Sequence, residues 1–132
     1  MRNIDIYQLR EKDLRAAYNR LSCVHGINFR YLKFSSIVSM LLEESAPRFY
    51  IAPEWAYQVI RRYKTKGIVT GNEAMLKDLV REYDRVKSQN PDMPVCQICK
   101  LAVESPAKSF YMSPHRVREI IFNYTGRNGK RK

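Results

Sequence analysis

The segment Ser45-Ala46-Pro47-Arg48-Phe49-Tyr50-Ile51-Ala52-Pro53 decides the fold, because a similar segment, Ser105-Pro106-Ala107-Lys108-Ser109-Phe110-Tyr111-Met112-Ser113-Pro114, occurs later in the same chain. In both segments a Glu-Ser pair ends an apolar run, a Phe-Tyr pair follows, and a proline begins a new periodic stretch. Proline disrupts a helix interior but is favoured at the first helical position. The sequence therefore predicts one structural unit that is used twice.

Two further pairs of segments indicate the same repeat. Residues 13–21 resemble residues 78–86 at a constant offset of 65, and residues 53–63 resemble residues 114–124 at an offset of 61. The difference between these offsets falls between the paired segments, where connections vary in length. In the second pair the matched positions form one apolar stripe and the polar positions differ, so we expect the shared part to be core.

Apolar residues recur at helical intervals in six segments that are bounded by glycine, proline or a capping residue. The expected helices cover residues 10–22, 29–45, 53–64, 73–88, 95–104 and 114–124. Gly26 and Gly126 suit the left-handed residue that closes a helix, and Asn72 and Ser113 suit the N-cap. The predicted fold is all-α, with two tandem three-helix repeats, a helix-turn-helix-like arrangement and short extended Phe-Tyr segments. We expect the Phe-Tyr pairs to pack in the core, with a base-stacking platform as the alternative.

The predicted domain organisation follows from the repeat. The first helical repeat covers residues 1–66, a glycine-bounded hinge covers 67–71, the second repeat covers 72–126, and residues 127–132 form a basic flexible tail. The sequence leaves open whether the repeats form one core or two, and whether they contact each other within one chain or swap between chains.

Net charge is the strongest global indication of a ligand. The 132-residue chain has 24 Lys and Arg against 13 Asp and Glu, a formal net charge of +11. Such an excess favours polyanionic partners, because each phosphate that a cation neutralises releases counterions. The composition, with 45% apolar and 28% charged residues, is typical of a globular protein. No apolar run has the length of a membrane span, so we expect a cytoplasmic protein without a membrane partner.

The candidate nucleic-acid-binding residues are basic side chains on the outward faces of the third and sixth predicted helices and in the tail. They are Arg61, Arg62, Lys64, Lys66, Arg116, Arg118, Arg127, Lys130, Arg131 and Lys132. A helix that carries Arg, Gln and Tyr outward fits the major groove of DNA. The sequence thus predicts a non-enzymatic nucleic-acid-binding protein, with double-stranded DNA favoured over RNA. The alternative is a protein-interaction or phage or mobile-element structural module without a nucleic-acid role, and a homodimer or a protein partner stays open.

Cysteine and histidine form no recognisable catalytic or metal-binding pattern. Cys96 and Cys99 make a C-x-x-C pair, but no second ligand pair follows at zinc-finger spacing. Aligning the Glu-Ser pairs of the two repeats, at an offset of 60, places these cysteines on Ser36 and Ser39, which indicates small packing residues on one side of a helix. Structural cysteines are therefore expected, with zinc binding or thiol redox chemistry as alternatives. Phosphate-binding glycine loops and hydrolase motifs do not occur, so neither an enzymatic activity nor a cofactor is expected.

One short phrase resembles known sequences. Ala46-Pro47-Arg48-Phe49-Tyr50-Ile51-Ala52-Pro53-Glu54 is similar to a phrase in uncharacterised small basic proteins of bacteria and their phages or mobile elements. The resemblance covers these residues alone. It implies a prokaryotic setting and no particular activity.

Overall fold

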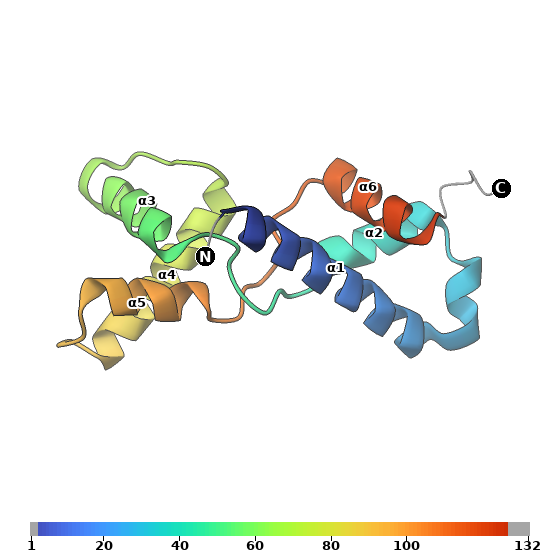
Figure 1. Cartoon of the computed structure of the whole chain (residues 1–132), viewed down its shortest axis with the longest axis horizontal. Helices are drawn as coiled ribbons and strands as arrows, with labels where there is room; N and C mark the ends of the chain where they lie inside the picture. The colour runs from blue at the N-terminus through green and yellow to red at the C-terminus, as the bar shows by residue number, and fades with distance from the viewer. Residues whose placement is uncertain (1–2, 127–132) are drawn as a thin grey trace.

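The computed structural model describes residues 3–126, and its regular elements are helices (Figure 1). In chain order they are α1 (Asn3–His25), the 3-10 helix η1 (Gly26–Tyr31), α2 (Phe34–Leu42), α3 (Pro53–Lys66), α4 (Glu73–Gln89), α5 (Val95–Val103) and α6 (Pro114–Thr125). The prediction of an all-α fold with six main helices is confirmed. In the described residues, the single β pairing is an isolated bridge between Ala46 and Ala107.

Several helix ends lie where the local sequence signals predict them. Gly26 and Gly126 have φ angles of 59° and 68° and directly follow α1 and α6. Asn72 and Ser113 each accept a hydrogen bond from the backbone N–H three residues later, at 2.9 and 3.1 Å. These contacts satisfy amide groups that the first helical turn leaves without intrahelical partners. The two predicted N-caps are therefore confirmed.

The second predicted helix is shorter than expected. The prediction placed one helix over residues 29–45, whereas the chain forms η1 first and begins α2 only at Phe34. Phe29 is buried edge-to-face against Tyr18 of α1, with ring centroids 5.2 Å apart. This contact requires the chain to turn back directly after α1, and the turn leaves Tyr31 76% exposed. The expected helix was therefore wrong in its first turn.

The helices pack into two lobes that combine parts of both predicted repeats (Figure 1). The central lobe, residues 53–103, contains α3, α4 and α5. The terminal lobe, residues 3–42 and 114–126, contains α1, η1, α2 and α6. The chain passes between the lobes in two crossover segments, residues 43–52 and 104–113. The third helix of each predicted repeat consequently packs on the first two helices of the other repeat.

This packing corrects the predicted domain organisation. Residues 1–66 and 72–126 do not form separate packing units, because α3 and α6 are exchanged between them. The segment 67–71, predicted as a hinge between repeats, joins α3 to α4 inside the central lobe. Because α2 and α3 lie in different lobes, they do not form the packed helix pair of a helix-turn-helix. The buried side chains of both lobes and of the crossover segments belong to one continuous core.

The crossover segments meet at a junction whose contacts occur in equivalent pairs. Ala46 and Ala107 exchange backbone hydrogen bonds of 3.0 and 2.9 Å. The aromatic rings of the two Phe-Tyr pairs stack on each other across the junction, with ring centroids 6.0 and 5.9 Å apart. The stacked rings are Phe49 on Tyr111 and Tyr50 on Phe110. Ala46 and Ala107 are therefore equivalent residues at offset 61, whereas the phenylalanine of each pair stacks on the tyrosine of the other.

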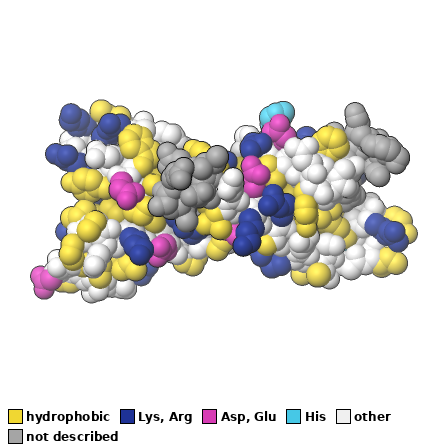
Figure 2. Space-filling view, in the orientation of Figure 1, with side chains coloured by type: hydrophobic (Ala, Val, Ile, Leu, Met, Phe, Trp, Pro, Cys, Tyr) yellow, Lys and Arg dark blue, Asp and Glu magenta, His cyan; other side chains and the backbone are white. Residues whose placement is uncertain are grey.

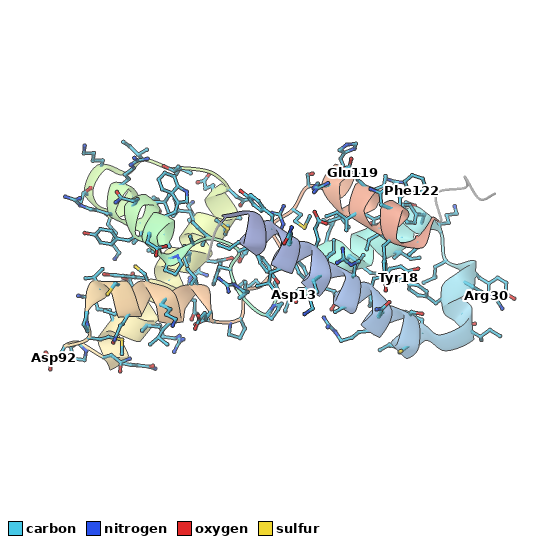
Figure 3. The ribbon with its side chains drawn as sticks, in the orientation of Figure 1. Asp13, Tyr18, Arg30, Asp92, Glu119 and Phe122 are labelled. Carbon is cyan, nitrogen blue, oxygen red and sulfur yellow. The ribbon has the colours of Figure 1, made fainter. Side chains whose placement is uncertain are left out.

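Each junction tyrosine also forms a hydrogen bond with the first long helix of its own predicted repeat. The Tyr50 hydroxyl donates to Asp13 of α1, and the Tyr111 hydroxyl donates to Asp78 of α4, both at 2.6 Å. Figure 3 shows Asp13 midway along α1. Burial, and then the hydrogen bond to a carboxylate, raise the pKa of both hydroxyls above the ordinary value of 10.0. The Phe-Tyr pairs thus have a packing and anchoring role in this structure.

Candidate nucleic-acid interface

α3 presents a basic face to solvent. Ala56, Val59 and Ile60 form its buried stripe against α4 and α5, so the opposite face is free of packing. The helix contains four basic residues and one acidic residue, Glu54, which gives it a net charge of +3. The exposed basic residues of its last two turns are Arg61, Arg62, Lys64 and Lys66. Figure 2 shows Lys and Arg side chains gathered at this outer end of the central lobe.

Lys64 is the most constrained of these cations. Its Nζ atom lies 2.6 Å from an Asp84 carboxylate oxygen of α4 and 5.6 Å from the centroid of the Tyr83 ring. The ion pair is partly exposed, with 41% and 53% of the two side chains accessible. Lys64 therefore has much of its charge compensated within the central lobe.

The other three α3 cations carry more available charge. The Arg62 guanidinium lies 5.4 Å from the centroid of the exposed Trp55 ring, a cation–π contact that leaves its charge uncompensated. Within residues 3–126, Arg61 and Lys66 form no ion pair. The outer end of α3 thus offers cations and an aromatic ring to an anionic ligand.

α6 presents a different surface, although the prediction placed candidate nucleic-acid-binding residues, Arg116 and Arg118, on it as well. Arg116 forms ion pairs with Glu11 of α1 at 2.9 Å and with Glu119 of α6 at 2.7 Å. The Arg118 guanidinium lies 5.2 Å from the centroid of the Phe34 ring of α2. The structure therefore does not join the predicted α3 and α6 residues into one surface, because they lie in different lobes and Arg116 is neutralised.

The remaining predicted residues belong to the basic tail. Arg127, Lys130, Arg131 and Lys132 lie outside the described residues. They contribute a formal charge of +4 to the chain. The geometry of the candidate site is therefore described from α3 and α6 alone.

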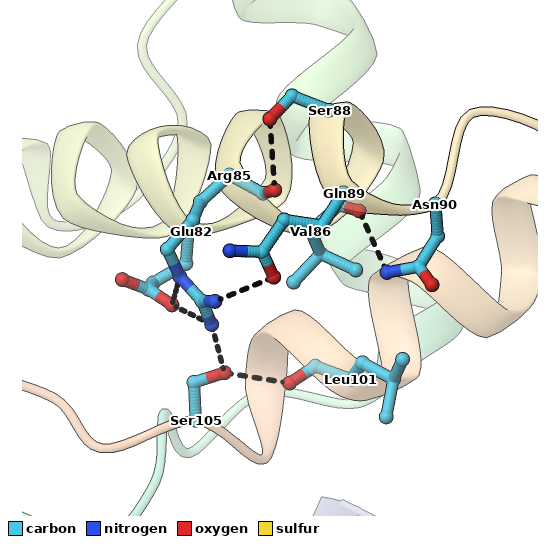
Figure 4. Close-up of polar contacts among 8 residues, drawn as sticks. All are labelled: Glu82, Arg85, Val86, Ser88, Gln89, Asn90, Leu101 and Ser105. Carbon is cyan, nitrogen blue, oxygen red and sulfur yellow. Dashed lines mark hydrogen bonds and ion pairs between the residues drawn. The ribbon is translucent and has the colours of Figure 1, made fainter.

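α4 shows why basic residues alone do not define an interface. It contains four basic and four acidic residues, and ion pairs join Lys77 to Glu73, Arg81 to Asp78 and Arg85 to Glu82. Figure 4 shows the Arg85 guanidinium held by Glu82, Gln89 and Ser105, the last at 3.5 Å on the segment that follows α5. Three of the four cations of α4 therefore have an acidic partner on their own helix, whereas on α3 only Lys64 has an acidic partner in the described residues.

A groove of about 590 Å³ adjoins the α3 face in the central lobe. Its lining includes Tyr57 and Gln58 of α3 together with Val95, Cys96 and Lys100 of α5. At offset 61, the equivalents of Tyr57 and Val95 in the terminal lobe are Arg118 and Phe34, which lie against each other. In the terminal lobe the Arg118–Phe34 contact fills the position that corresponds to the groove, whereas in the central lobe this position is an open groove.

The structure revises the expected register of the cysteines. α2 and α5 correspond at offset 61, so Cys99 aligns with Val38, and both are buried, whereas Cys96 aligns with Ser35, and both are exposed. The expected alignment with Ser36 and Ser39 and the shared inward side were wrong, because Cys96 lies in the first turn of α5, outside its packed stripe. Burial raises the pKa of the Cys99 thiol, which disfavours the thiolate needed for redox chemistry or metal binding. Among residues 3–126, no three His, Cys, Asp or Glu side chains converge as ligands for a metal ion.

Sequence reasoning missed a second basic surface at the far end of the terminal lobe. Arg30 and Lys33 are exposed there, and Figure 3 shows Arg30 at the end of the molecule. The signal was present in the sequence, because no Asp or Glu occurs between residues 14 and 42. It was overlooked because Arg30 and Lys33 fall inside the expected helix 29–45, which was interpreted as part of the core.

Across residues 3–126, the helices lack the combination of length and apolar composition required to cross a bilayer. Comparisons with protein-family models, with curated proteins and with solved structures find no match to this chain.

Proposed function

We propose that this protein binds nucleic acid without catalysing a reaction, and that the solvent-facing side of α3 makes the principal contact. The observation that carries the proposal is the gathering of four cations at the outer end of one helix, where only Lys64 has an acidic partner in the described chain. The formal net charge of +11 favours the same class of ligand.

Double-stranded DNA is the favoured ligand in this proposal. The major groove of B-DNA admits an α-helix, whereas the major groove of A-form RNA is too narrow for side chains to read. Arg61 and Lys66 are suited to phosphate contacts, and Gln58 faces solvent on the same side of α3 and can reach a base edge. Arg62 remains beside Trp55, whose exposed ring adds a stacking surface.

The test is the salt dependence of binding to a mixed-sequence DNA duplex, followed by mobility shift. We expect a complex at low salt whose affinity falls steeply as salt rises. Replacing the two α3 cations without ion pairs, in the variant Arg61→Gln with Lys66→Gln, should reduce the slope of log K against log salt by about 0.9 for each phosphate that the protein no longer neutralises.

The matched control is Lys12→Gln with Lys87→Gln, which removes the same charge from exposed positions on other helices. It should leave most of the affinity and the slope in place. The absence of any complex at low salt, or an equal effect of both double variants, would contradict binding through α3. The first outcome favours the alternative, a protein-interaction module without a nucleic-acid role.

A further inference from the structure

The far end of the terminal lobe carries apolar side chains that the fold does not use. Val24, Ile27 and Tyr31 are 79%, 70% and 76% exposed, which makes them the most exposed large hydrophobic residues of the described chain. They lie at the end of α1 and in η1, where Phe29 is the residue of η1 that packs into the core. We name residues 24–33 the tip. Exposed apolar clusters of this kind mark interaction surfaces more often than they serve stability.

The tip includes a helix connection that is longer than the equivalent connection in the central lobe. Eight residues, 26–33, connect α1 to α2, whereas five residues, 90–94, connect the equivalent helices α4 and α5. The shorter connection is sufficient to join two packed helices in the central lobe. The longer one contains the exposed 3-10 helix, so its side chains are available for a role other than closing the bundle.

The charge around the tip has a single sign. Arg30 and Lys33 are exposed within it, neither forms an ion pair in residues 3–126, and no acidic residue occurs between residues 14 and 42. Figure 2 shows Lys and Arg side chains with hydrophobic side chains beside them at this end of the molecule. An apolar centre with a cationic rim complements a partner that has apolar side chains and carboxylates.

The tip also has a recess beside its protruding side chains. A cavity of about 350 Å³ is lined by Tyr18, Ser22, Gly26, Ile27, Phe29 and Arg30. Protruding apolar residues beside a recess suit a partner of defined shape that can insert a side chain. A lipid surface offers no such side chain. A phosphate backbone is charged and would make no apolar contact with Val24 and Ile27.

We infer that the tip binds an acidic peptide segment of another protein, with apolar side chains that contact Ile27 and Tyr31 and carboxylates that contact Arg30 and Lys33. This inference does not depend on the proposed nucleic-acid function, because α3 lies in the other lobe. It would give the molecule a protein-binding end and a separate cationic end.

The experiment selects displayed random peptides on the full-length protein and measures the enriched peptides by fluorescence anisotropy. We expect enriched sequences that combine Asp or Glu with large apolar residues. The variant Ile27→Ser with Tyr31→Ser should weaken their binding by about tenfold or more, and Arg30→Gln with Lys33→Gln should weaken it and reduce its salt dependence. Since these side chains are exposed, the helical content measured by circular dichroism should remain unchanged.

The control variant is Ile68→Ser, which removes an exposed apolar side chain from the central lobe. It should leave peptide binding unchanged. The inference is overturned if no peptide is enriched, or if enriched peptides bind wild type and the Ile27→Ser, Tyr31→Ser variant equally. It is also overturned if phosphatidylglycerol vesicles, rather than peptides, bind the protein in a manner that requires Ile27 and Tyr31.

Discussion

α3 and α6 begin with an equivalent proline and bury equivalent stripes, yet their outer faces differ in charge. Val59 and Ile60 in the central lobe correspond to Ile120 and Ile121 in the terminal lobe, and all four are buried. The outer face of α3 carries cations that mostly lack acidic partners. On α6, by contrast, Arg116 is neutralised by two glutamates.

The difference teaches which positions the fold constrains. The buried stripes and the junction contacts are shared because each third helix must cross to the other lobe and pack there. The outward positions carry no such constraint, since a solvated helix face contributes little to packing. The α3 face has three cations without an acidic partner, whereas on α6 Arg116 is paired, and this difference supports the proposed contact through α3.

The largest expected effect tests whether the two lobes unfold together. Leu14 in α1 and Leu79 in α4 are equivalent at offset 65, and both have no exposed surface. Leu14→Ala and Leu79→Ala should each lower the free energy of unfolding by about 2–5 kcal/mol, because each leaves a cavity in a close-packed core.

The measurement is urea denaturation followed by two signals. Circular dichroism reports on all helices, and the fluorescence of Trp55, the single tryptophan, reports on the central lobe. Because one core continues through the junction, Leu14→Ala in the terminal lobe should shift the Trp55 transition to lower urea as well. A Trp55 transition that stays at the wild-type midpoint would show that the lobes unfold independently.

The next prediction compares the outward arginines of the two lobes. Arg61→Gln with Arg62→Gln in α3 should weaken binding to duplex DNA by about tenfold near 0.1 M salt for each phosphate that is no longer neutralised. Arg116→Gln with Arg118→Gln in α6 should weaken binding less, because Arg116 is already paired with Glu11 and Glu119 and both residues lie in the other lobe. Affinities from anisotropy titrations over a range of salt concentrations decide between them. An equal weakening in the two variants would place the contact on both lobes and remove the distinction between α3 and α6.

The sequence predicted the local structure better than the packing. Periodicity and caps determine where α3 to α6 begin, because these signals act within a few residues of one another. The exchange of α3 and α6 depends on the direction that the crossover segments take, and this is fixed by long-range contacts such as Tyr50 with Asp13. No local pattern encodes that direction.

The candidate site was predicted in part for the same reason. The cations of α3 were identified correctly as exposed, because a helical period separates them from the buried stripe. Their difference from Arg116 could not be predicted, since its partner Glu11 lies 105 residues away in the chain. The tip was missed because residues 29–33 were assigned to the second helix, whereas the chain turns at Gly26 and forms η1 there.

A smaller effect concerns the two junction hydroxyls. Tyr50→Phe and Tyr111→Phe should each lower the free energy of unfolding by about 1–2 kcal/mol near neutral pH, because each removes a hydrogen bond to a partly buried carboxylate. Folding raises the pKa of both tyrosines above 10.0, so their contribution is complete below pH 10 and is lost as the pH rises beyond it. Thermal unfolding measured from neutral to strongly alkaline pH checks both parts. Either phenylalanine variant should show a weaker loss of stability above pH 10 than wild type, and an unchanged alkaline loss would contradict the assignment.

The smallest effect isolates the acidic partner of the α3 face. Asp84→Asn removes the carboxylate that pairs with Lys64, and because the pair is exposed, the free energy of unfolding should change by less than about 1 kcal/mol. Freed from this partner, Lys64 can contact a phosphate, so the affinity for duplex DNA should rise and the slope of log K against log salt should steepen by up to about 0.9.

Asp92→Asn provides the comparison, because it removes the same charge from the turn before α5, where Figure 3 shows Asp92, and not from a residue that pairs with an α3 cation. If α3 is the contact, Asp84→Asn should increase the affinity more than Asp92→Asn and should alone change the salt slope. Equal increases from both variants would mean that DNA responds only to the net charge of the protein. In that case the cations at the end of α3 would have no privileged role, and the contrast between the two lobes would be one of packing alone.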